Sequence, residues 1–280
     1  MNQGDICIVT AFMLEAETFI HNLGLKQETL FREYPTFIGE NEGIHYTVLI
    51  SGLGAFRMAQ MIAWAFGKTL VRPSTSIINI GIAGHSNLEF GQIFKANKCV
   101  SSFSNETWFP PMVLKDSLIQ SSLYCVSKPE TDYKLAGGYD MESAGFFSAI
   151  SKFGIPELCH AFKVVSDNPQ NSWRDLNKSE IPMIIEKNIS ILMPVFKELG
   201  NLSRNELDLS TEHPAYDIIL KKAHFSKTQQ FQLSKLLKRW DTYFPHSDPL
   251  DKLGNPVNSK QWLQKLTAKL DFPMPSKFAP

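Results

Sequence analysis

The stretch "IHYTVLISGLGAFRMAQMIAWAFGKTLVRPSTSIINIGIAGH", residues 44–85, decides the fold class. It opens with the apolar run Ile44–Ile50, closes that run with the turn "SGLG", and continues with a helical pattern from Ala55 to about Leu70. Pro73 ends the helix, because a proline disfavours helical backbone in the residue before it. Ser76–Ile80 is a second apolar run, and it enters the glycine-containing loop "GIAGH". A strand, a helix and a second strand in this order indicate an α/β protein with parallel strands.

The same alternation extends on both sides of this unit. Apolar runs predict strands, and runs with helical spacing predict helices, at Asp5–Thr10 (strand), Met13–Leu23 (helix), Gln92–Val100 (strand), Met141–Phe153 (helix), 158–166 (strand) and Ile184–Leu199 (helix). Strands that alternate with helices indicate an α/β protein with a mostly parallel sheet, whose functional loops lie beyond the carboxyl ends of the strands.

The pattern changes after residue 200, which divides the chain into residues 1–200 and a helical extension, 201–280. "NLSRNELDLSTEHP" is a polar stretch that predicts a linker. In "FSKTQQFQLSKLLKRW", apolar side chains fall on one helical stripe, and Ser226 and Gln229 have capping-box spacing. The extension carries a net charge of +4 and residues 1–200 carry −4. A basic helical extension is consistent with a solvated face, with attraction to the first part of the chain, or with a protein partner at these helices.

Composition excludes several classes of function. Lysine and arginine balance aspartate and glutamate at 28 each, which argues against a dedicated binder of nucleic acid or of anionic membranes. The four cysteines are far apart and have no metal-ligand spacing, so buried free thiols are expected and neither a metal nor another cofactor is. The apolar run "ICIVTAFML" lacks a basic leader and leads into Glu15 and Glu17, which predicts a buried strand entering a helix rather than a signal peptide. We therefore expect a cytoplasmic protein.

Polar and glycine-rich segments follow the predicted strands and are expected to meet at one edge of the sheet. They are "TAFMLEAE", "SGLG", "NIGIAGH" and "VVSDNP". Glu15 is consistent with a solvated acid in the first turn of a helix, and Asp167 with turn chemistry before Asn168-Pro169. A carboxylate directly after an apolar strand also has to be paired or protonated, and it can then have the raised pKa of a general acid.

The stretch 137–147, "GGYDMESAGFF", places Met141 between two carboxylates. Asp140 has the position of a helix-start acid, which caps the first turn. That role does not account for Met141 and Glu142, which together would suit a ligand with one apolar face and hydroxyl groups.

The order of "AFMLE", "SGLG", "INIGIAGH", "YDMES" and "VVSDNP" resembles the nucleoside phosphorylase/nucleosidase superfamily, and most of all its 5′-methylthioadenosine/S-adenosylhomocysteine nucleosidases. The resemblance covers residues 5 to about 199. It implies a three-layer α/β sandwich with a central twisted, mixed, mostly parallel sheet, to which the C-terminal helical extension is added. It also implies a homodimer or larger homo-oligomer.

The resemblance further implies a role for each matching residue. Glu15 would activate the attacking water, and Asp167 would donate a proton toward the purine N7. Met141 would pack on the ribose, and Glu142 would accept hydrogen bonds from its hydroxyls. The substrate site would also include Gly52, Asn79, Gly81 and Ser166, and the substrate would be a purine nucleoside, related to methylthioadenosine or adenosylhomocysteine or an atypical adenosyl compound.

Three activities remain open at this point. Hydrolysis is favoured over phosphorolysis, because Asn79 stands where the similar phosphorylases have a phosphate-binding arginine, and Arg57 is the only nearby substitute. A non-catalytic nucleoside-binding or assembly module is the third reading, since the segment between Val100 and Asp140 is shorter than in the nucleosidases and would leave the base pocket incomplete. Phe103, Trp108 and Phe109 are candidates to stack on a base or to cover the core.

Overall fold

The computed structural model describes residues 4–210, 213–244 and 247–270. The chain divides into two compact units, Met1–Leu207 and Asp208–Pro280. The division lies seven residues beyond the boundary expected at residue 200, and it falls within a helix. The two units are described separately below.

The first unit is built on one sheet of ten strands among the described residues, in the order β10-β6-β8-β9-β5-β1-β4-β3-β2, with β7 paired to β6. The strands are β1 (Gly4–Thr10), β2 (Lys26–Gln27), β3 (Thr36–Asn41), β4 (Ile44–Ile50), β5 (Ser76–His85), β6 (Ile93–Ser101), β7 (Thr107–Trp108), β8 (Ile119–Cys125), β9 (Gly138–Asp140) and β10 (Cys159–Asp167). Strands β4, β1, β5 and β10 run parallel, whereas β3–β4 and β10–β6 are antiparallel pairs. The sheet is therefore mixed, as predicted.

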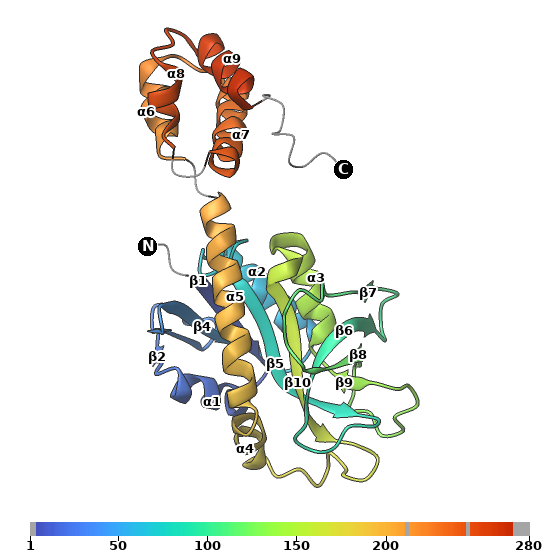
Figure 1. The fold of residues 1–280 in the computed structure, drawn as a ribbon. Coiled ribbons are helices and arrows are strands. Elements are labelled where there is room, and N and C mark those ends of the chain that lie inside the picture. The colour runs from blue at the N-terminus through green and yellow to red at the C-terminus, as the bar shows by residue number, and fades with distance from the viewer. Residues whose placement is uncertain (1–3, 211–212, 245–246, 271–280) are drawn as a thin grey trace. The chain divides into compact units, whose positions relative to one another are not determined.

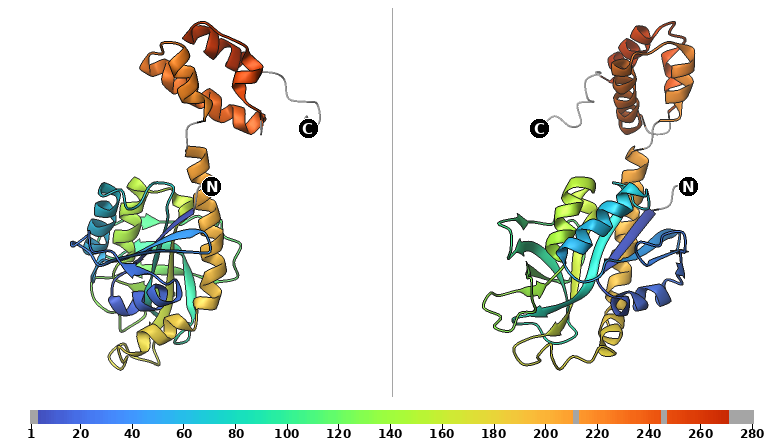
Figure 2. Two further views of the ribbon diagram at one scale, coloured as in Figure 1. Left: turned by 90° about the vertical axis from the view of Figure 1, so that its left-hand side faces the viewer. Right: turned by 180° about the vertical axis from the view of Figure 1, so that it is seen from behind.

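Helices cover both faces of this sheet (Figures 1 and 2). One face packs against α1 (Met13–Asn22), α4 (Glu180–Glu186) and α5 (Ile189–Ser210). The other packs against α2 (Ala55–Gly67) and α3 (Ser143–Phe153), which precedes a short 3₁₀ turn at Pro156–Leu158. Three layers result, which confirms the predicted sandwich.

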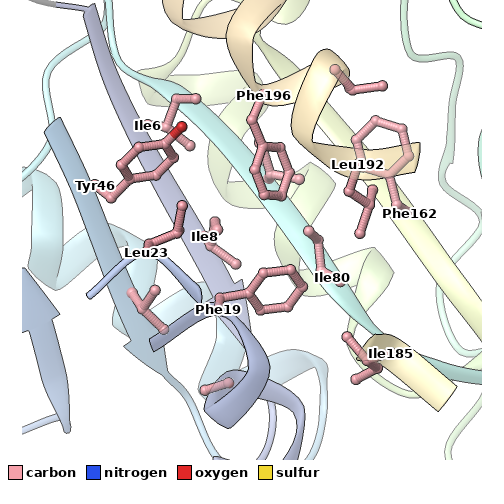
Figure 3. Packing of buried hydrophobic residues seen from close by; sticks show 14 of the residues in the cluster. Ile6, Ile8, Phe19, Leu23, Tyr46, Ile80, Phe162, Ile185, Leu192 and Phe196 are labelled. Atoms are coloured by element: carbon pink, nitrogen blue, oxygen red, sulfur yellow. The ribbon is translucent and has the colours of Figure 1, made fainter. Parts of the chain in front are cut away.

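The apolar character of β1 on both faces explains why it is a central strand. Ile6 and Ile8 point into the core beneath α1 and α5, beside Phe19 and Phe196 (Figure 3). Cys7 and Val9 point into the opposite core, with α2 and α3. A strand buried on both faces reads as a continuous apolar run rather than an alternating one, as sequences of parallel strands do.

Strand β5 runs through "GIAGH", which we expected to be a loop. Its last residues, Gly84 and His85, pair with Tyr139 and Gly138 of β9, so the backbone of this stretch is satisfied by sheet hydrogen bonds. The expectation was wrong because β9 is only three residues long and gave no periodic signal. Strands β3 and β8 were likewise not predicted.

Helix α5 continues to Ser210, so most of the predicted linker is helical. The helix continues beyond residue 200 because it still contacts the rest of the first unit there. Leu202 packs against the core, and the Ser203 hydroxyl accepts the Asp5 N–H at 3.0 Å. Part of the predicted linker, residues 211–212, lies outside the described residues. The predicted helix at 184–199 is in fact divided between α4 and α5.

The second unit contains helices α6 (Ala215–Lys222), α7 (Lys227–Tyr243), α8 (Pro249–Leu253) and α9 (Ser259–Leu270), with no strand among its described residues. These helices enclose a core of their own, formed among others by Leu233, Leu237, Trp240, Trp262 and Leu266. Ser226 and Gln229 form the capping box that their spacing predicted, with the Ser226 N–H donated to Gln229 Oε1 at 2.9 Å.

All four cysteines are buried free thiols, as expected. Within the part of the chain that the structure describes, no helix has the length and apolar character needed to cross a membrane.

Candidate active site

A cavity of about 470 Å³ opens where β5, β9 and β10 end and α1 and α3 begin. Its volume lies within the range typical of small-molecule sites. Five of the predicted site residues line it: Glu15, Met141, Glu142, Ser166 and Asp167. Apolar and aromatic side chains complete the wall, among them Phe12, Leu53, Ile82, Tyr139 and Trp173.

Glu15 is buried, with 3% of its surface exposed, which excludes a solvated helix-start acid. Its Oε2 accepts the backbone N–H groups of Ala11 at 2.8 Å and Phe12 at 3.0 Å, and its Oε1 accepts that of Ile82 at 2.9 Å. Burial raises the pKa of the carboxyl above its ordinary value, against the lowering effects of Lys163 and of these hydrogen bonds.

Gly81 lies directly beside this carboxylate. A β-carbon at Gly81 would lie 2.5 Å from Glu15 Oε1, so a side chain there would displace the acid. Gly81 does not line the cavity and acts here by leaving room for Glu15.

Met141 and Glu142 connect β9 to α3 and line the cavity. Glu142 Oε1 accepts the backbone N–H of Gly54 at 2.8 Å, at the start of α2. Burial and then the negative charge of Asp140 raise the pKa of Glu142 to about 7. This carboxyl is therefore about half protonated near pH 7.

Asp140, which also lines the cavity, forms a buried ion pair with Lys163 at 3.0 Å. Its carboxylate also accepts the N–H of Ser143, the first residue of α3, at 3.0 Å and the Ser143 hydroxyl at 2.6 Å. Asp140 therefore bonds the start of α3 from the last position of β9, two residues before the N-cap Glu142, and not from the N-cap or first turn that was expected. Burial disfavours the charged ammonium, but the surrounding carboxylates, Asp140 first, raise the pKa of Lys163 overall.

Sequence reasoning missed Lys163. The available signal was its position as the single charged residue in the apolar run "AFKVV" of a buried strand, where a charge requires a partner.

Asp167 ends β10 with 7% of its surface exposed and is bonded through both oxygens. Oδ1 accepts the Ser166 hydroxyl at 2.5 Å, and Oδ2 accepts the hydroxyl of Tyr133. A β-carbon at Gly84 would lie 2.5 Å from Oδ2, so glycine is required there. Sequence reasoning also missed Tyr133, which lies 34 residues from Asp167 in a segment without periodic pattern.

Three predicted positions, Gly52, Asn79 and Gly81, do not line the cavity. Asn79 lies within the sheet, where its side-chain amide donates to Val9 O at 3.2 Å and its Oδ1 is buried without a partner among the described residues. Gly52 has a left-handed φ of 79° and packs on the side chain of Arg57, which is exposed and does not line the cavity either.

The aromatic residues considered for base stacking also lie elsewhere. Trp108 stacks on Phe147 with ring centroids 6.5 Å apart, and with Phe109 it lines a different hollow. Among the described residues no three histidine, cysteine, aspartate or glutamate side chains are grouped so that they could hold a metal ion.

Solved nucleosidases share this fold. The futalosine hydrolase mutant of Helicobacter pylori is 12% identical with a TM-score of 0.58, and the match covers 70% of this chain and 99% of that one. For the 5′-methylthioadenosine/S-adenosylhomocysteine nucleosidase of the same bacterium the identity is 14%, the TM-score 0.60, and the coverage 71% and 100%. The 5′-methylthioadenosine nucleosidase of Arabidopsis thaliana is 16% identical with a TM-score of 0.60, and the match covers 73% of this chain and 100% of that one.

No protein-family model and no curated protein sequence matches the chain. At these identities the structural likeness shows that the chain shares the predicted fold with these solved nucleosidases, and it leaves the activity to be argued from the site.

Proposed function

We propose that the protein hydrolyses the N-glycosidic bond of a purine nucleoside. The observation that carries this proposal is the meeting of Glu15, Met141, Glu142 and Asp167 in one cavity. The fold shared with solved nucleosidases supports it.

The two catalytic roles follow from what this bond needs in order to break. Water attacks C1′ of the sugar as the C1′–N9 bond breaks and its electron pair passes to the purine. Glu15 takes the proton of the attacking water, for which a carboxylate of raised pKa is a stronger base than an ordinary one. Asp167 gives a proton to N7, so the base leaves neutral.

Met141 and Glu142 suit the sugar between these two groups. The thioether presents an apolar surface to the ribose ring, and the Glu142 carboxylate accepts hydrogen bonds from its hydroxyls. Negative charge on Glu15 and Glu142 would also stabilise the ribosyl cation that develops as the bond breaks.

Water is favoured over phosphate as the nucleophile because acidic side chains outnumber basic ones among the residues that line the cavity. Glu15, Glu142 and Asp140 line it, whereas Arg57 lies outside it. A phosphate dianion would be repelled by these carboxylates, and the starts of α1 and α3 that face the cavity already carry Glu15 and Glu142. A phosphate-dependent phosphorylase is the second candidate, because Arg174 and Lys178, both exposed, also line the cavity.

The substrate we propose is an adenosyl compound related to methylthioadenosine or adenosylhomocysteine. The chain would act as a homodimer, as the resemblance to the nucleosidases implies. The basic C-terminal helices, with a net charge of +4 over residues 201–280, would be available to a protein partner.

The test is a panel of 5′-methylthioadenosine, S-adenosylhomocysteine, adenosine and inosine, incubated with the full chain with and without phosphate and separated by chromatography. Free base and free sugar without phosphate support hydrolysis, and a phosphate requirement with a ribose-1-phosphate product supports the second candidate. Calorimetric binding without any base release would instead identify a non-catalytic nucleoside-binding module.

A further inference from the structure

Tyr133 stands out because its backbone is held in a conformation that non-glycine residues seldom adopt. Its φ is 46°, in the left-handed region, within the loop that joins β8 to β9. Such a conformation costs energy and persists where the surroundings fix it, often at functional sites.

The loop is fixed on the C-terminal side of Tyr133. The Tyr139 hydroxyl accepts the N–H of Leu135 and donates to the carbonyl of the same residue, each at 2.8 Å. The N–H of Gly137 is donated to Ser86 Oγ at 2.9 Å. The edge of the Tyr133 ring also meets Tyr139, with centroids 5.7 Å apart and planes at 86°.

The fixed loop directs the Tyr133 hydroxyl onto Asp167. The hydroxyl donates to Oδ2 while Ser166 donates to Oδ1, so donors hold both oxygens and restrict rotation of the carboxyl group. Burial, and then the hydrogen bond to Asp167, raise the pKa of Tyr133 above its ordinary value. The phenol therefore keeps its proton and remains a donor across the physiological range.

Tyr133 holds Asp167 from outside the reaction space. Asp167 and Ser166 line the cavity, whereas Tyr133 is not among the described residues that do. Gly84 allows this arrangement, since a β-carbon there would lie 2.5 Å from Asp167 Oδ2 and 3.2 Å from Tyr133 Cε1.

We propose that Tyr133 is a positioning residue for Asp167, which it holds in the orientation that delivers a proton to the leaving base. The inference rests on the proposed function. In this step the proton passes from the Asp167 carboxyl to the purine nitrogen while the C1′–N9 electron pair is taken up by the base. Tyr133 keeps its own proton throughout and acts only through the carboxyl group.

A substrate whose leaving group needs no proton separates this role from a structural one. 4-Nitrophenyl β-D-riboside releases a stable phenolate, so it requires the sugar site and the attacking water but not the acid. For a purine nucleoside, Tyr133→Phe should lower kcat roughly tenfold to a hundredfold, the loss expected for one hydrogen bond to the Asp167 carboxylate that forms as the proton leaves. KM should change by less than about threefold, because the ground-state contacts to the substrate remain.

For the nitrophenyl riboside, both Tyr133→Phe and Asp167→Asn should retain kcat within about threefold of the wild type, whereas Glu15→Gln should lose activity on both substrates. Tyr124→Phe is the matched control. Its ring lies in the same aromatic cluster, 5.4 Å from Tyr139, and it should leave both activities unchanged.

The outcomes distinguish the two claims. Undiminished nucleoside cleavage by Tyr133→Phe, or an equal loss on both substrates, overturns the role of Tyr133 and leaves the proposed function intact. Failure of the wild type to cleave any purine nucleoside overturns the proposed function and the role of Tyr133 together.

Discussion

The buried ion pair between Asp140 and Lys163 predicts that Lys163→Met severely destabilises the first unit. The methionine side chain has a similar volume but leaves the Asp140 carboxylate buried without its cation. At the observed separation of 3.0 Å, an effective dielectric constant of about 20 gives a gross attraction of roughly 5–6 kcal/mol. Removing one partner of a buried pair costs about 3–5 kcal/mol in practice, which for a unit of this size lowers the melting temperature by roughly 6–20 °C.

The assay is unfolding in urea, monitored by hydrogen exchange in peptides from β1, β5 and β10. Exchange in these strands reports the first unit separately from the helical one, so the two need not unfold together. Lys197→Met is the matched control. Its ammonium lies 3.9 Å from Glu42, both side chains are 70% exposed, and its loss should cost less than about 0.5 kcal/mol.

The double variant Lys163→Met with Asp140→Asn completes the test. It removes both charges and should recover part of the stability that the single variant loses, because the uncompensated carboxylate is gone. A loss below about 1 kcal/mol for Lys163→Met, or a double variant less stable than the single one, would refute the reasoning.

Three further predictions concern the cavity. Glu142→Gln should impair nucleoside turnover far more than Asp140→Asn, whose main effect should be on stability. Steady-state kinetics and unfolding curves of the two variants test this. Equal effects of both changes would mean that residues 137–147 serve only as a helix start. Gly84→Ala should lower turnover roughly tenfold or more by displacing Asp167. The helical control is Gly67→Ala, where an added β-carbon would meet nothing within 4 Å beyond its own helix and chain neighbours, and it should stabilise by about 0.5–1 kcal/mol. Normal kinetics in Gly84→Ala would contradict the packing. Because the folded state raises the pKa of Glu142 to about 7, protonation of this carboxyl stabilises the folded state. That contribution to the free energy of unfolding is complete below about pH 4.5 and is lost as the pH rises through 7. Across that window the wild type should lose up to about 3 kcal/mol that Glu142→Gln does not, and parallel stability–pH curves for the two proteins would be the contrary result.

The sequence predicted the elements whose burial is visible in local composition. Strands β1 and β4 and helix α2 follow from continuous apolar runs and helical spacing, and they were placed to within a few residues. Strand β9, by contrast, is three residues long and is defined by its pairing with β5 and β8. Such a strand exists only because of partners distant in the sequence.

In the candidate site, too, the residues could be predicted from the sequence but their contacts could not. Glu15, Met141, Glu142, Ser166 and Asp167 could be named because they follow predicted strands and match a motif order. The environment of each could not be read from the sequence, since the donors to Glu15 include Ile82, 67 residues away, and the donors to Asp167 include Tyr133, 34 residues away. For this reason a solvated Glu15 was a reasonable expectation and was wrong.

Base release in phosphate-free buffer tests the central claim most directly. The wild type should convert a purine nucleoside to free base and free sugar, and Asp167→Asn should be roughly a hundredfold to ten-thousandfold slower while its unfolding curve is unchanged. Failure of the wild type to release base from any member of a broad nucleoside panel, or full activity in Asp167→Asn, would contradict the account.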